Sequence, residues 1–413
     1  MAPSGMDRST GKKSKKGVRG ILVVFGALAA LGFHAWLLKS GVVPAGVGLA
    51  SFGMLCLFLS FVQTRSIETK EQVPAQGSSG QGMPMQVTPM QAVTSSARSE
   101  AQLVGRPGSR QAVPAGISNA FTIDLEDYFH TEVASSSVPF SRWDSMPSRI
   151  PSTVPRLLDK LEKHSVRSTV FVLGWVARKH PALVREIAQR GHEIACHSNI
   201  HRAVFRLDAA DFYQDTHAAM HSIEDAAGQA VRGYRAPSFS ITPGTEWAFD
   251  ILGELGFQYD SSVNPVRHKF YGNPDAPRVP YKIGKTGLLE IPVATWRLAG
   301  RNLPVGGGAY LRLLPYRYMK AGLKSINEKE GRPFTIYMHP WEIDSFQSPL
   351  NLKLKSHIRQ TWGTKGMDGK LDNLLTSFKF APIWDVYSHL MPAAQSTQQT
   401  SAPRMTQVAE MAS

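Results

Sequence analysis

The chain has 413 residues, of which 42% are hydrophobic and 19% are charged, so one large folded domain with segments outside it is expected. The formal net charge is +14, and six basic residues stand before residue 20, directly ahead of an apolar run: Arg8, Lys12, Lys13, Lys15, Lys16 and Arg19. This location favours a membrane over nucleic acid as the partner of the charge, because neither zinc-finger spacing nor a basic stripe interleaved with aromatic residues follows. With only two cysteines, Cys56 and Cys196, a disulfide framework is not expected.

Residues 1–19 form a basic N-terminus, and residues 20–63 are almost uncharged. A helix crosses the hydrocarbon core with roughly 20 apolar residues, so this length predicts two transmembrane helices. A turn is expected between Lys39 and Pro44, and Arg65 and Lys70 place positive charge after the second run. The favoured topology is a hairpin with both ends, and hence the folded domain, on the cytoplasmic side. The alternatives are a single tilted crossing with the domain outside, and a cleaved signal peptide.

The remaining chain divides by composition. Residues 64–118 predict a flexible linker rich in Gln, Ser, Pro, Gly and Met, and residues 391–413 predict a disordered tail. Residues 119–390 form the folded part. Strands are expected at 120–125, 167–174, 192–197, 231–237 and 288–293, and helices at 154–165, 181–191, 209–228 and 245–256. This alternation predicts an α/β fold, a distorted (β/α) barrel with a parallel sheet covered by helices, whose chemistry gathers at the carboxyl ends of the strands.

Three carboxylates stand at the end of the first expected strand, in the sequence FTIDLEDYFH. Because side chains alternate along a strand, Asp124 and Glu126 should point to one face and Asp127 to the other, or into the loop beyond. Two neighbouring carboxylates in an apolar surrounding repel each other unless a cation lies between them or one retains a proton. Taken alone, the cluster is equally consistent with cap or loop residues.

Two histidines, His197 and His201, follow another expected strand in GHEIACHSNIHR. Their spacing allows two neutral imidazoles to bind one divalent ion, and two histidines with one carboxylate leave coordination positions open for water and substrate. The pattern therefore favours a catalytic metal site. Cys196 should turn away from it as a small buried residue.

Three further polar residues end later segments: Arg235 in YRAPSFS, Asp260 in YDSS and His339 in YMHPWE. Each has an ordinary structural explanation, as a surface ion pair, a turn cap and the end of an edge strand. The joint occurrence of all three with the two clusters above favours a shared site.

The ordered segments TIDLED, HEIACHSNIH, RAPSFS, YDSS and YMHPWE resemble those of the polysaccharide deacetylases, metal-dependent carbohydrate esterases, over roughly residues 120–386. The segment EIPVATWRLAGRNLPVGGGAYLRLLPY, together with HPWEID, resembles a branch encoded in exopolysaccharide loci associated with exosortase sorting systems. Residues 265–390 are interpreted as the part specific to this branch. The resemblance implies a catalytic domain over residues 119–390. The apolar N-terminal region lies outside the resemblance, and it predicts a location at a bacterial inner membrane.

The resemblance also implies roles for individual residues. Asp124 matches the general base, His197 and His201 the metal-binding histidines, and Arg235 the arginine that orients the base. His339 matches the general acid, with Asp260 as an orienting partner for it. Leu125 replaces the second aspartate of the commoner motif, so the carboxylate ligand must be Glu126 or Asp127, and same-face geometry favours Glu126.

These roles imply hydrolysis of an acetamide, with a divalent ion, zinc being favoured, as the cofactor. The expected substrate is an N-acetylated polysaccharide or oligosaccharide, or a lipid-linked precursor, in exopolysaccharide biosynthesis. The membrane and exopolysaccharide assembly proteins are the other expected partners, and nucleic acid is not. Two alternatives remain: an amidohydrolase acting on a small-molecule amide, and a non-catalytic glycan-binding or assembly component.

The glycines of GGGAY, Gly306 to Gly308, are expected to form a flexible loop near the substrate groove, since no lysine and serine or threonine follow them as in a phosphate loop. Trp296, Trp341 and Tyr310 could stack on sugar rings or belong to the core.

Overall fold

The computed structural model describes residues 116–391, apart from residues 269, 270 and 285. The expected basic N-terminus and transmembrane region lie outside the described residues, as do nearly all of the linker and of the C-terminal tail. Within the described residues, no helix is both long enough and apolar enough to cross a membrane.

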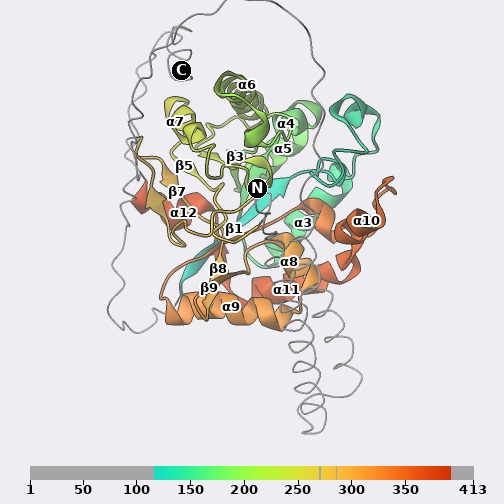
Figure 1. The fold of residues 1–413 in the computed structure, drawn as a ribbon. Coiled ribbons are helices and arrows are strands. Elements are labelled where there is room, and N and C mark those ends of the chain that lie inside the picture. The colour runs from blue at the N-terminus through green and yellow to red at the C-terminus, as the bar shows by residue number, and fades with distance from the viewer. Residues whose placement is uncertain (1–115, 269–270, 285, 392–413) are drawn as a thin grey trace, which may run out of the picture. The chain divides into compact units, whose positions relative to one another are not determined.

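A nine-stranded sheet forms the centre of the described domain, in the order β10-β1-β2-β3-β4-β5-β7-β6, with β11 also paired to β1 (Figure 1). All of these pairs are parallel except that of β6 with β7. The strands are β1 (Ser118–Leu125), β2 (Thr169–Val172), β3 (Glu193–Cys196), β4 (Gly233–Tyr234), β5 (Tyr259–Asp260), β6 (Tyr281–Lys282), β7 (Leu289–Glu290), β10 (Thr335–Met338) and β11 (Lys379–Ala381). A separate antiparallel pair consists of β8 (Thr295–Leu298) and β9 (Arg301–Pro304).

Helices surround this sheet (Figure 1). They are α3 (Ile150–Lys163), α4 (Gly174–Lys179), α5 (Pro181–Gln189), α6 (Ala209–Ala227), α7 (Trp247–Glu254), α8 (Gly308–Leu313), α9 (Tyr316–Lys329), α10 (Leu354–Thr361), α11 (Thr364–Ser377) and α12 (Ile383–Tyr387). Short 3-10 helices lie at Phe140–Ser145, Val204–Arg206, Pro237–Phe239, Pro340–Ile343 and Ser388–Leu390. Each strand and helix expected between residues 120 and 293 has a counterpart here, whereas α4 was not anticipated.

Local sequence signals explain the bounds of the longest helix, α6. The side chain of Asp208 accepts a hydrogen bond from the backbone N–H of Asp211 at 2.8 Å, which caps the first turn. Gly228 ends the helix in the left-handed conformation, with φ of 71°, which glycine adopts without a steric penalty.

The predicted distorted (β/α) barrel takes the form of a curled sheet with an open strand order. β10 stands at one end of the hydrogen-bonded path and β6 at the other. Two isolated backbone bonds bridge this gap, from Ala294 N–H to Thr335 C=O at 2.9 Å and from Tyr337 N–H to Gly306 C=O at 2.8 Å. The chain after β7 turns into the β8–β9 pair and so forms no continuous ladder with β10.

The two faces of β1 have different surroundings. Phe121, Ile123 and Leu125 belong to the large apolar cluster that also contains residues of the surrounding helices. Ala120, on the opposite face, packs in a second cluster with core residues of β2, β3, β5 and β7 and of α12. Because side chains alternate, Thr122 and Asp124 continue this inner face toward the carboxyl ends of the strands. The alternation along β1 thus places polar side chains at the carboxyl end of the sheet.

Candidate active site

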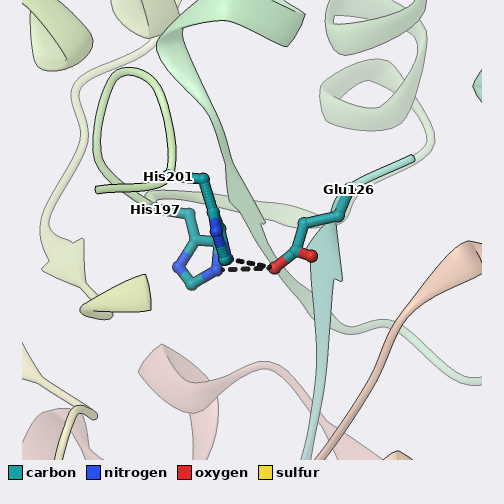
Figure 2. A group of neighbouring side chains, drawn as sticks. All are labelled: Glu126, His197 and His201. Carbon is teal, nitrogen blue, oxygen red and sulfur yellow. Dashed lines mark hydrogen bonds and ion pairs between the residues drawn. The ribbon is translucent and has the colours of Figure 1, made fainter. Parts of the chain in front are cut away.

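Glu126, His197 and His201 converge at the carboxyl ends of β1 and β3 (Figure 2). Oε1 of Glu126 lies 3.0 Å from Nε2 of His197 and 3.0 Å from Nε2 of His201. Among the described residues, this is the group of histidine, cysteine and acidic side chains whose donor atoms could hold a metal ion. Burial raises the pKa of Glu126, but the neighbouring histidines outweigh it and hold this pKa well below its ordinary value. The carboxylate is therefore ionised and available as a ligand.

The turn that carries both histidines is fixed from several sides. Ser198 and His201 adopt left-handed backbone conformations, with φ of 67° and 56°, which cost roughly 1–3 kcal/mol each in residues other than glycine. The hydroxyl of Ser198 accepts a hydrogen bond from His201 N–H at 3.1 Å, and Asp215 on α6 accepts one from Asn199 N–H at 2.8 Å. The backbone N–H of Gly174, where α4 begins, donates to Ser198 C=O at 3.0 Å. The surrounding contacts therefore hold a strained turn that presents both imidazoles.

A backbone contact also sets the orientation of the His197 ring. Its Nδ1 lies 2.7 Å from the carbonyl oxygen of Arg235, so Nδ1 carries the proton and donates it to that oxygen. This tautomer leaves the lone pair of Nε2 directed at Glu126. Metal-binding histidines are commonly oriented by such a second hydrogen bond.

Asp127 points elsewhere and caps a helix. Its Oδ2 accepts hydrogen bonds from the Ser148 hydroxyl at 2.7 Å and from the backbone N–H groups of Arg149 at 2.9 Å and Ile150 at 3.4 Å, at the start of α3. Its Oδ1 accepts one from Tyr128 N–H at 3.1 Å. Between the two carboxylates that the sequence left open as ligands, Glu126 therefore stands with the histidines and Asp127 satisfies a helix terminus.

Replacing Asp127 with alanine is expected to lower the free energy of unfolding by about 1–2 kcal/mol, because α3 loses its cap. Metal content should stay at the wild-type level, whereas Glu126→Gln should lose metal. Chemical denaturation and elemental analysis of the two variants measure these effects. A loss of metal in Asp127→Ala equal to that in Glu126→Gln would instead place Asp127 among the ligands.

Asp124 is held by Arg235, and both side chains are buried. Nη1 of Arg235 donates to Asp124 Oδ1 at 2.7 Å and to the Thr122 hydroxyl at 2.7 Å. Ser261 accepts from the same guanidinium through its carbonyl at 3.1 Å and its hydroxyl at 2.9 Å. The guanidinium also stacks over the Phe171 ring at 4.1 Å. These contacts immobilise one oxygen of Asp124, while its Oδ2 lies 3.9 Å from Nε2 of His339.

His339, at the end of β10, faces the same centre. Its Nε2 lies 3.9 Å from Asp124 Oδ2 and 3.8 Å from Glu126 Oε1, and its side chain is 17% exposed, against 3% for both carboxylates. Burial lowers the pKa of His339, but Glu126, Glu342 and Asp124 outweigh burial and raise this pKa to about 9. The imidazole is thus protonated at neutral pH and accessible from solvent.

Glu342 is the residue beside His339 that the sequence analysis missed. Its Oε2 accepts a hydrogen bond from His339 N–H at 3.1 Å and lies 3.5 Å from His339 Nδ1. Its Oε1 lies 3.4 Å from Nε of the buried Arg312. The sequence HPWE contained a signal for this contact, because its glutamate follows the histidine by three residues. Glu342 thus takes the third position of the short helix Pro340–Ile343, from which its side chain can reach back to the residue before the helix.

Asp260 requires a correction, because it does not occupy the place expected for an orienting partner of His339. It is fully buried and accepts hydrogen bonds from the Ser262 hydroxyl at 2.6 Å and the Ser262 N–H at 3.0 Å. Glu290 pairs with it across β5 and β7, and burial together with the charge of Asp260 raises the pKa of Glu290 well above its ordinary value. This carboxyl pair keeps a proton and supports the segment whose Ser261 holds Arg235.

The glycine run is packed, in contrast to the flexible loop expected for it. Gly306, Gly307 and Gly308 are buried, and Gly308 begins α8. A Cβ on Gly308 would overlap the carboxylate of Glu342, and one on Gly307 would lie 2.7 Å from the Tyr337 ring. The glycines therefore allow close approach of the backbone to the strand and helix that carry His339 and Glu342.

The three aromatic residues considered for sugar stacking take structural positions. Trp341 is 6% exposed and stacks on His339 at 5.2 Å with 22° between the rings. Trp296 packs against Tyr318 at 5.8 Å, and the hydroxyl of Tyr310 lies 3.2 Å from that of Tyr271. Each of the three is buried or partly buried in the described domain.

The donor set fits a divalent ion. In a tetrahedral site with metal–ligand bonds of about 2.1 Å, the donor atoms lie about 3.4 Å from one another. This is close to the 3.0 Å that separates Oε1 of Glu126 from Nε2 of each histidine. The nitrogen and oxygen donors suit zinc and several other first-row ions, so the geometry does not choose among them. Three protein ligands leave at least one position for water or substrate, which is typical of catalytic sites.

Comparison with known families gives two matches along the chain. Residues 136–259 match the family model described as polysaccharide deacetylase, and residues 261–388 match a domain of unknown function (DUF3473). His197, His201 and Arg235 lie in the first matched segment and His339 in the second, whereas Asp124 and Glu126 lie shortly before the first.

Individual proteins are similar over the same region. The chain is 32% identical to a chitooligosaccharide deacetylase of a Bradyrhizobium species over 122 residues, which are 29% of this chain and 52% of that protein. It is 27% identical to a peptidoglycan-N-acetylglucosamine deacetylase of Bacillus cereus over 124 residues, 27% of this chain and 45% of that protein. The chain thus spans about half the length of these curated relatives. A crystal structure of a candidate polysaccharide deacetylase from Mycobacterium smegmatis aligns with a TM-score of 0.46 and 21% identity, covering 72% of this chain and 99% of that one.

Proposed function

We propose, from the premise that this chain contains a polysaccharide deacetylase domain, that it is a metal-dependent N-deacetylase acting on N-acetylhexosamines of a polysaccharide or its lipid-linked precursor. The observation that carries this proposal is the convergence of a histidine and carboxylate metal group, an arginine-held aspartate and a protonated histidine within one buried centre. The relatives reported above, named as a chitooligosaccharide deacetylase and a peptidoglycan-N-acetylglucosamine deacetylase, support the substrate class.

The first chemical task falls to Asp124. Arg235 fixes Oδ1, so Oδ2 is held at a constant position, 3.9 Å from Nε2 of His339, which itself lies 3.8 Å from Glu126 Oε1. An ionised carboxylate in this position can accept a proton from an attacking water. A divalent ion held by Glu126, His197 and His201 would polarise the acetamide carbonyl and acidify water.

The second task falls to His339. The amide nitrogen of the substrate must gain a proton before it can leave as an amine. His339 can donate it from Nε2, which lies 3.9 Å from Asp124 Oδ2, the oxygen that Arg235 does not bind. A divalent ion bound to Glu126 would offset the negative charge of that carboxylate and so reduce its contribution to the raised pKa of His339. Glu342, which contacts no metal-binding residue, would then be the carboxylate that keeps His339 protonated.

Removal of the metal is expected to abolish acetate release from N-acetylglucosamine oligomers. The purified chain is assayed before chelation, after chelation and dialysis, and after addition of Zn²⁺ or another divalent ion, with metal content measured at each step. Recovery on addition of one ion would also identify the cofactor. Acetate release that persists in metal-free protein would contradict the proposal, as would the absence of acetate release from every N-acetylated oligomer by metal-loaded protein.

The role in exopolysaccharide biosynthesis rests on the segment after residue 260. This segment supplies His339 and Glu342 and matches a family of unknown function rather than the deacetylase family itself. We infer that it adapts the deacetylase centre to a particular polymer. Comparing acetate release from isolated exopolysaccharide and from chitooligosaccharides checks this inference, and equal or lower activity on the exopolysaccharide would contradict it.

A further inference from the structure

Exposed apolar side chains are concentrated in one short segment. Among the described residues, seven large hydrophobic side chains are exposed: Phe140, Phe205, Leu298, Phe346, Leu354, Ile358 and Trp362. Four of these lie between residues 346 and 362, in the loop before α10, on α10 itself and at its C-cap, Trp362, and Phe346 and Leu354 are 75% and 73% exposed. Figure 1 shows α10 at the periphery of the domain. Single exposed apolar residues are ordinary, but a cluster of this kind indicates a contact surface.

The helix α10 turns its apolar face outward. Leu354, Ile358 and Trp362 are spaced by four residues and form one stripe, called here the outer stripe. Gln360, about 200° round the helix from Ile358, is 3% exposed. Its amide donates a hydrogen bond to Tyr128 C=O at 2.9 Å and accepts one from Thr131 at 3.4 Å. A surface helix ordinarily shows the reverse arrangement, with polar groups outside and apolar groups inside.

Hydrogen bonds from the domain hold the C-terminal end of α10 and fix the orientation of the outer stripe. The guanidinium of Arg312 donates to the carbonyl oxygens of Arg359, at 2.9 Å, and of Trp362. Arg312 itself is buried. The outer stripe therefore cannot turn inward by rotation of α10 without breaking these bonds and those of Gln360.

Positive charge surrounds the outer stripe. From residue 345 to residue 367 the chain carries Lys353, Lys355, Arg359 and Lys365 and no acidic residue. Three of these are exposed, and Arg359 is partly exposed. Apolar residues along one face, bordered by lysine and arginine, are typical of helices that lie in the interface of an anionic bilayer.

We propose that α10 docks the domain onto an anionic lipid bilayer, with the outer stripe in the headgroup region and the four basic side chains against the lipid phosphates. A second, independent feature points to the same occupant: residues 20–63 form an apolar run of the length needed to enter a membrane. The linker of residues 64–118 would then hold the domain close to the bilayer surface. This inference does not depend on the deacetylase activity.

The test places a probe in the outer stripe of the full chain. Leu354→Cys is made in a Cys56→Ala background, labelled with an environment-sensitive fluorophore, and reconstituted into nanodiscs of phosphatidylcholine alone or mixed with phosphatidylglycerol. Cys196 is fully buried and stays unlabelled under native conditions. Leu298→Cys, at an exposed position on β8, is the matched control. A quencher attached to the lipid acyl chains reports contact with the bilayer.

In discs that contain phosphatidylglycerol, we expect quenching at position 354 and none at position 298. Lys353→Gln and Lys355→Gln should each weaken the bilayer-bound state by about fivefold. Three outcomes would overturn the proposal: no quenching at position 354, equal quenching in neutral discs, or a blue-shifted emission that the lipid quencher leaves unchanged. The last would mean that protein, from this chain or a second copy, covers the outer stripe.

Discussion

Replacing Asp124 with asparagine is expected to lower kcat for acetate release from N-acetylglucosamine oligomers by about 10²- to 10⁴-fold, the usual contribution of a positioned general base. The amide is close in size to the carboxylate, and its oxygen can still accept the hydrogen bond from Arg235 that now measures 2.7 Å. The change therefore removes the ability to accept a proton while it keeps the shape of the site. Steady-state assays with measured metal content record the effect.

Two variants separate this effect from damage to the site. Asp127→Asn removes a carboxylate three residues further on that binds the start of α3, so acetate release should remain near the wild-type level. His201→Ala should lose both metal and activity, whereas Asp124→Asn should keep the metal. Acetate release by Asp124→Asn at the wild-type rate would show that another group acts as the base.

Replacing His339 with asparagine is expected to slow amide hydrolysis by about 10²- to 10⁴-fold, because the amine then leaves without a proton donor. An aryl acetate ester has a leaving group that needs no such proton, so its hydrolysis should be much less affected. The ratio of amide to ester hydrolysis is the quantity to measure. Asp124→Asn should depress both reactions and thus provides the contrast.

The pH profile gives a second readout for His339. Because the acid must be protonated, wild-type activity should fall as pH rises through the pKa of His339, which its neighbours raise toward about 9. Glu342→Gln removes one carboxylate that raises this pKa, so the loss of activity should move to lower pH while the ester reaction changes little. An unchanged alkaline limb in Glu342→Gln, or equal losses of amide and ester hydrolysis in His339→Asn, would remove His339 from the role of acid.

Most strands and helices between residues 120 and 293, though not α4 or β6, could be predicted because each depends on local pattern. The strand AFTIDL and the helix over residues 209–227 carry periodicities and end signals that are complete within a few residues of the chain. The closure of the sheet could not be predicted in the same way. It depends on whether the chain after β7 forms a continuous hydrogen-bonded ladder with β10. Here only two backbone hydrogen bonds join them: Ala294 N–H donates to Thr335 C=O, and Tyr337 N–H donates to Gly306 C=O.

The partner of His339 shows the same limit within the site. The sequence resemblance assigned Asp260 to this role. Whether Asp260 lies beside His339 depends, however, on how closely the ends of β5 and β10 approach each other in the folded chain. In the fold, Asp260 accepts hydrogen bonds from Ser262 and pairs with Glu290, whose pKa burial and the charge of Asp260 raise well above its ordinary value. Glu342 instead stands beside His339. The space for Glu342 exists because Gly308 has no side chain, and the two residues are far apart in sequence.

Local sequence patterns were enough to identify the polar residues of the site and their order: a carboxylate cluster after one strand, two histidines after another, and an arginine and a histidine after later ones. Side-chain alternation, a local property, was enough to favour Glu126 over Asp127 as the partner of the histidines. Only the tertiary structure decided what the remaining carboxylates do, with Asp127 at a helix terminus, Asp260 paired with Glu290, and Glu342 beside His339. The physical reason is that the partner of a buried charge is chosen by distance in space, which the packing of separate elements sets and no local pattern encodes.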